Sequence, residues 1–66
     1  MYIDFYWNGS IVGYTYHMFI NEKEIDLNLN YCSKSEAINK IATYLKQTYD
    51  MNYDRGSIEF KWGGRL

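Results

Sequence analysis

The amino-acid sequence predicts an α+β fold, in which three strands, one helix and a fourth strand form a single domain over residues 1–66. Apolar residues alternate with polar ones through most of residues 1–31, recur at helical spacing from residue 33 to 49, and alternate again from residue 57 to 62. A period of two is typical of a strand, and spacings of three and four are typical of an amphipathic helix. A chain of 66 residues is too short for two independent cores.

The first two strands are predicted to form a hairpin. Its apolar face carries Ile3, Phe5, Trp7, Tyr14, Tyr16, Met18 and Ile20. Asn8 and Gly9 suit a two-residue type I′ turn, because both central residues of that turn need a positive φ. This turn places Phe5 opposite Val12.

The third strand is predicted over residues 25–31, where the alternation is most regular. Its apolar positions are Ile25, Leu27, Leu29 and Tyr31. A polar four-residue loop at residues 21–24 precedes it and pairs Ile20 with Ile25. Three strands therefore share one apolar face.

A helix is predicted to begin after Ser33. Ser33 and Glu36 fit a capping box, in which the serine hydroxyl accepts a hydrogen bond from an amide of the first turn. The apolar positions at helical spacing are Ala37, Ile38, Ile41, Ala42, Leu45 and Tyr49. After a turn-rich stretch at residues 52–56, alternation predicts a fourth strand over residues 57–62.

The order of these elements predicts the sheet topology. A helix that returns along the sheet lets the fourth strand run parallel to the first, and a right-handed crossover favours the spatial order 3-2-1-4 in a four-stranded mixed sheet. The helix packs on one face. The residues expected between helix and sheet are Phe5, Val12, Tyr16, Leu27, Leu29, Ile38, Ile41, Leu45 and Phe60.

The face opposite the helix is expected to stay open and to bind a partner, because one helix covers one face and monomers rarely expose large apolar patches without a use. The candidate contact residues on this face are Tyr2, Asp4, Tyr6, Ile11, His17 and Phe19. Tyr53 and Arg55, in the turn after the helix, are further candidates, because interfaces often mix aromatic and charged residues. The alternative interpretation is that solvated tyrosines are present for their strand propensity alone.

Composition disfavours several functional classes. Seven Lys/Arg and eight Asp/Glu give a net charge of -1, and the open face offers few cations, which disfavours nucleic-acid binding. No stretch approaches the roughly 20 apolar residues of a membrane span. The chain start does not resemble a secretory signal, so we expect a cytoplasmic protein that does not enter a membrane.

Catalytic chemistry is not predicted. His17 is the only histidine and Cys32 the only cysteine, so a disulfide framework, a zinc cluster and a paired nucleophile and base all lack the residues they need. No cofactor motif is present. The expectation is therefore a protein that is not an enzyme and that binds no cofactor or metal.

The strand and helix order, with the run Tyr6-Trp7-Asn8-Gly9-Ser10, resembles the first half of a ribonuclease H-like fold, as in HicB-like antitoxins. In that resemblance Asn8 replaces the metal-binding aspartate that usually precedes Gly-Ser, while Glu36 matches a second carboxylate position. No carboxylate ends the fourth strand, and a two-metal nuclease needs several. The resemblance therefore implies a catalytically degenerate relative. In size and topology the chain also resembles small bacteriophage-encoded inhibitors.

The function expected from the sequence is that of a small protein-binding module. The resemblance implies an inhibitor of a host or defence protein, encoded by a phage or mobile element, that acts through its aromatic sheet face or an edge strand. An antitoxin-like or nucleic-acid-binding module is the alternative. A homodimer is a further expectation, because an undefended edge strand recruits another strand.

Overall fold

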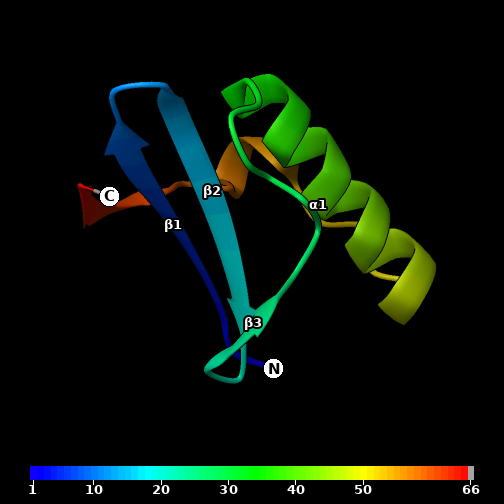
Figure 1. The fold of residues 1–66 in the computed structure, drawn as a ribbon. Helices are drawn as coiled ribbons and strands as arrows, with labels where there is room; N and C mark the ends of the chain where they lie inside the picture. The colour runs from blue at the N-terminus through cyan, green and yellow to red at the C-terminus, as the bar shows by residue number, and fades with distance from the viewer. Residues whose placement is uncertain (66) are drawn as a thin grey trace.

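The computed structural model describes residues 1–65 and has the predicted α+β fold. Its elements are β1 (Ile3–Ser10), β2 (Gly13–Ile20), β3 (Lys23–Ile25), α1 (Lys34–Tyr49), the short 3-10 helix η1 (Arg55–Ser57) and β4 (Lys61–Arg65). The four strands form one sheet in the order β3-β2-β1-β4, with β4 parallel to β1 and the other pairs antiparallel. The helix lies along one side of the sheet (Figure 1). The predicted topology is confirmed.

The first hairpin turns later than predicted. β1 runs through Asn8 and Gly9 to Ser10, and the loop consists of Ile11 and Val12. Phe5 pairs with Met18 instead of Val12. The change moves the pairing by an even number of residues, so residues 3–7 and 14–20 keep their predicted faces of the sheet, whereas Ile11 and Val12 leave the strands.

Local hydrogen bonds explain the longer hairpin. The Ser10 hydroxyl accepts from the Val12 amide at 3.3 Å and donates to the Gly13 carbonyl at 3.2 Å. Gly13 supplies a positive φ of 142°. The extra strand pairs up to Ser10 and Gly13 outweigh the turn preference of Asn8 and Gly9.

The second hairpin has a two-residue turn and not the four-residue loop predicted. Asn21 and Glu22 have φ values of 51° and 69°, as a type I′ turn requires, and Ile20 pairs with Lys23. The turn is tied to the start of the chain. The Asn21 amide donates to the Tyr2 carbonyl at 2.8 Å, and the Tyr2 amide donates to the Asn21 side chain at 3.0 Å.

The predicted third strand is interrupted after Ile25. The chain bends where the Asn28 amide donates to the Asp26 carboxylate at 3.0 Å, and Asn28 takes a φ of 56°. Short polar side chains form such turns in competition with a strand ladder. Pairing resumes at Asn30, which bridges to Thr15 in the predicted register.

The helix forms as predicted, with Ser33 as its N-cap. The Ser33 hydroxyl accepts from the Glu36 amide at 3.1 Å. At the other end, Asp50 adopts the left-handed conformation that ends many helices, and its amide donates to the Lys46 carbonyl at 2.9 Å. Tyr49, which we expected on the buried stripe, is exposed.

The fourth strand begins later than predicted, at Lys61. The Asp54 carboxylate accepts from the Gly56 amide at 3.0 Å and caps η1, so the start of the predicted strand is a helical turn. Ile58 is nonetheless buried. Trp62 pairs with Trp7, which sets β4 beside β1.

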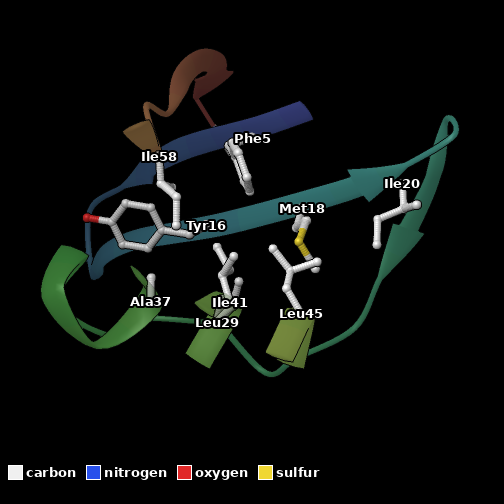
Figure 2. Packing of buried hydrophobic residues seen from close by; sticks show 9 residues of the cluster. All are labelled: Phe5, Tyr16, Met18, Ile20, Leu29, Ala37, Ile41, Leu45 and Ile58. Atoms are coloured by element: carbon white, nitrogen blue, oxygen red, sulfur yellow. The ribbon is translucent and has the colours of Figure 1, made fainter. Parts of the chain in front are cut away.

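The core lies between α1 and the sheet (Figure 2). Its buried members are Phe5, Tyr16, Met18, Ile20, Leu29, Ala37, Ile41, Leu45 and Ile58. Of the residues predicted there, Leu27, Ile38 and Phe60 are only partly buried. The predicted core position of Val12 is wrong, because Val12 lies in the hairpin loop with 67% of its surface exposed.

Candidate functional site

The helix-free face of the sheet holds four of the predicted contact residues. Asp4, Tyr6, His17 and Phe19 share it, since Asp4 pairs with Phe19 and Tyr6 pairs with His17. The rings of Tyr6 and Phe19 meet edge to face at 5.7 Å. The prediction that these residues lie together is therefore confirmed.

This face is more polar than its sequence indicates. The Glu24 carboxylate lies 2.6 Å from Nδ1 of His17, and Nζ of Lys61 lies 3.7 Å from the Asp4 carboxylate and 6.0 Å from the Tyr6 ring centre. Among the described residues, Nε2 of His17 is buried without a hydrogen-bond partner. Tyr6 is only partly exposed. Charged side chains on the neighbouring strands thus lie beside the Tyr6 and Phe19 rings and reduce the apolar area that a partner could contact.

Two other candidates from the first hairpin lie outside its paired strands. Tyr2 precedes β1 and is exposed beside the second turn. Ile11 is fully exposed in the loop between β1 and β2, and not on the open face as predicted. The reason is the later hairpin turn, which removes Ile11 from the strand.

The two candidates from the turn after the helix lie on the helix side. Tyr53 packs edge to face against Phe5 at 5.9 Å, which makes it part of the core margin. Nε of Arg55 donates to the Asn39 side chain on α1 at 3.1 Å. These contacts give both residues a structural role, and they do not join the open face.

An exposed apolar group that includes only one of the predicted contact residues, Ile11, lies where β1 and β2 are joined; it holds five of the eight large apolar side chains that are exposed among the described residues. We call it the hairpin-end surface, and it consists of Ile11, Val12, Tyr14, Tyr31 and Trp62. Tyr14 and Trp62 both approach Gly9, and Tyr31 lies against Gly13. Tyr14 and Trp62 are each 53% exposed.

The start of the helix explains this exposure. Ala37, in the first turn of α1, lies at the Tyr16 end of the core, and Leu45 lies at the Met18 end (Figure 2). The helix therefore covers the sheet from Tyr16 toward β3. Tyr14, two residues before Tyr16 on the same face of β2, is 53% exposed.

A cleft of about 300 Å³ opens beside the hairpin-end surface. We call it the aromatic cleft, and its lining residues are Trp7, Tyr14, Tyr16, Lys34 and Phe60. Trp7 meets Tyr14 at 5.2 Å and Trp62 at 4.4 Å between ring centres, and Tyr16 meets Phe60 at 4.7 Å. The rings support one another, so the cleft has preformed apolar walls.

Among the described lining residues, the polar side-chain groups of the aromatic cleft are the hydroxyls of Tyr14 and Tyr16, the indole N–H of Trp7 and the ammonium of Lys34. Lys34, the first residue of α1, is exposed, and the ion pairs found within residues 1–65 involve other cations. Burial, together with Cys32 and Tyr14 nearby, raises the pKa of the Tyr16 hydroxyl. That hydroxyl stays protonated near neutral pH and can donate a hydrogen bond.

Within residues 1–65, no group of three or more His, Cys, Asp or Glu side chains is placed to hold a metal ion. No helix in this part of the chain is long and apolar enough to cross a membrane.

Comparison with known proteins finds no matching protein family, no similar curated protein and no similar solved structure. The candidate site is therefore interpreted from its own chemistry.

Proposed function

We propose that this protein is a non-enzymatic module that binds another protein through its hairpin-end surface. The observation that carries this proposal is the exposure of Tyr14, Tyr31 and Trp62 next to the aromatic cleft. Tyrosine and tryptophan dominate the binding energy of many protein interfaces. Their rigid rings bury much apolar area at a small cost in conformational entropy.

The hairpin-end surface suits this role better than the helix-free face. On the helix-free face, the Glu24 and Lys61 side chains already contact His17 and Asp4. A partner there would have to displace these contacts and desolvate the charges. At the hairpin end, each fully buried aromatic ring would contribute roughly 1.5–3 kcal/mol of apolar transfer energy.

So small a module acts by occupying a surface of its partner. A partner whose own ligand needs that surface is inhibited, which is the role that the resemblance to phage-encoded inhibitors implies. Inhibition of a host or defence protein is therefore the form of the proposal that we favour.

Affinity capture from a bacterial lysate tests the surface. Tyr14→Ser/Trp62→Ser removes two exposed rings of the hairpin-end surface, and we expect it to lose the proteins retained by the wild type. The matched control is Tyr2→Ser/Tyr49→Ser, which removes two exposed rings elsewhere. The control should retain the same proteins as the wild type.

A third variant separates the two faces. Tyr6→Ser/Phe19→Ser alters the helix-free face alone. Loss of the captured proteins with this variant, and their retention by Tyr14→Ser/Trp62→Ser, would place the interface on the helix-free face and contradict the proposal. Circular dichroism of every variant checks that the fold is intact.

A further inference from the structure

We infer that the aromatic cleft takes an acidic segment of the partner protein, with one bulky apolar side chain inserted between the rings and a carboxylate placed beside Lys34. The inference rests on the proposed function, because it names the chemistry that the same site would recognise. It draws on the size, the walls and the polar groups of the cleft.

The size and walls of the cleft fit one side chain. A volume of about 300 Å³ is at the lower end of the range for small-molecule sites. Trp7, Tyr16 and Phe60 present ring faces and edges in tilted or perpendicular pairs. An inserted aromatic or branched aliphatic side chain can meet these rings at the separations that aromatic pairs prefer.

The polar groups of the cleft are suited to a carboxylate. Lys34 supplies a positive charge, and the described part of the lining contains no Asp or Glu. The Tyr16 hydroxyl points away from the rest of the buried cluster (Figure 2). The hydroxyls of Tyr14 and Tyr16 can both donate to an anion. A basic segment would place a like charge near Lys34 and would find no carboxylate in the lining.

A protein segment fits these features better than a nucleic acid. A single strand could stack a base on the rings, but its binding would need several cations that follow the phosphates. Lys34 is the one cation among the lining residues that the structure describes, and the chain has a net charge of -1. Nucleic acid is therefore an alternative outcome of the test.

Tryptophan fluorescence reports directly on the cleft. The two tryptophans of the chain, Trp7 and Trp62, lie in contact at this end of the sheet. The probes are three blocked pentapeptides, Glu-Asp-Phe-Asp-Glu, Glu-Asp-Ala-Asp-Glu and Lys-Lys-Phe-Lys-Lys, together with an oligothymidylate. The acidic phenylalanine peptide should change the emission saturably and bind more tightly than the other three probes.

Two charge reversals test the role of Lys34. Lys34→Glu should weaken binding of the acidic phenylalanine peptide by roughly fivefold or more, because it replaces an exposed ion pair with repulsion. Lys23→Glu makes the same change in net charge, but Lys23 lies on β3, at the far end of β2 from the hairpin loop. Because salt strongly screens charges beyond a Debye length, this variant should bind the peptide with an affinity within about twofold of the wild type.

The outcomes separate this inference from the proposed function. The inference would be overturned if Lys34→Glu and Lys23→Glu weakened binding of the acidic phenylalanine peptide equally. It would also be overturned if the basic peptide or the oligothymidylate bound more tightly than the acidic phenylalanine peptide. If the acidic phenylalanine peptide fails to bind while Tyr14→Ser/Trp62→Ser still loses the captured proteins, the inference falls and the proposed function stands. If capture does not depend on these rings, the proposed function itself falls.

Discussion

Val12 and Phe5 show how far residue preferences can be used to predict positions. The sequence places Val12 opposite Phe5 because Asn8 and Gly9 favour a turn, whereas the structure pairs Phe5 with Met18 and leaves Val12 in the loop. The preference of Asn8 and Gly9 for a turn is a local effect, and the hydrogen bonds of added strand pairs can outweigh it. The faces of residues 3–7 and 14–20 were predictable, because side chains alternate along a strand and an even shift in pairing does not change their face.

The exposure of the candidate residues was harder to predict than their faces. Tyr6 and Phe19 share the open face as expected, but the side chains of Glu24 and Lys61 screen it. Those contacts depend on the positions of β3 and β4, which the alternation alone does not give. The exposure of Trp62 depends likewise on where the helix begins.

Leu29 and Leu27 test the residue-scale account of the core. Leu29 is 4% exposed, so Leu29→Ala should lower the free energy of unfolding by about 2–5 kcal/mol. Leu27, on the bent segment, is only partly buried, and Leu27→Ala should cost less than about 2 kcal/mol. Urea denaturation measures both. Equal losses would show that residues 25–31 form the regular strand that the alternation predicts.

Tyr16 predicts a dependence of stability on alkaline pH. Burial raises the pKa of its hydroxyl, so the unfolded chain releases the proton first as pH rises. The stability from this group is fully present below about pH 10 and is lost as pH rises through the folded pKa. Tyr16→Phe should therefore show a shallower fall in urea midpoint between about pH 9 and about pH 11 than the wild type. Parallel curves would contradict the assignment.

At the scale of elements, the helix and the strand order were predictable and the turns were not. Ser33 and Glu36 signal a helix start that does not depend on distant contacts, and the helix begins there. Asn21 and Glu22 form the type I′ turn, although Glu22 has no special preference for a positive φ. The turn persists because Asn21 is held by two hydrogen bonds to Tyr2.

A pair of glycine changes tests which residues form the hairpin turns. Glu22→Gly should raise the free energy of unfolding by up to about 1 kcal/mol, because it relieves a left-handed residue that has a Cβ atom. Gly9→Ala should not destabilise, since Gly9 lies in β1 and an added Cβ would meet Trp62 at an ordinary 3.4 Å. Thermal unfolding measures both changes. Strong destabilisation by Gly9→Ala would indicate a turn at that residue.

At the scale of the whole molecule, one helix is too short to cover a sheet rich in aromatic rings. A chain this small leaves much of its apolar surface exposed. The sequence correctly predicts that aromatic residues remain exposed, but it places them on the helix-free face. The structure concentrates them at the hairpin end, because α1 begins at the Tyr16 end of the core.

The homodimer remains a prediction, but the structure makes its expected route, addition of a strand at the edge strand β3, less favourable. β3 is an edge strand of three residues, and the exposed side chains of Lys23 and Glu24 hinder addition of another strand. Sedimentation equilibrium over a hundredfold range of concentration tests the homodimer, and a constant mass of 7.9 kDa would contradict it. If the mass of the wild type doubles at high concentration and the mass of Tyr14→Ser/Trp62→Ser stays at the monomer value, a second copy binds the hairpin-end surface.

Site-specific photo-crosslinking tests the hairpin-end surface most directly. A photoreactive phenylalanine analogue replaces Tyr14, Phe19 or Tyr49 in three separate preparations, which sample the hairpin end, the helix-free face and the end of the helix. After irradiation in a bacterial lysate, the Tyr14 position should form a defined covalent adduct with a partner protein, and the other two positions should not. An adduct from the Phe19 or Tyr49 position without one from Tyr14 would contradict the account.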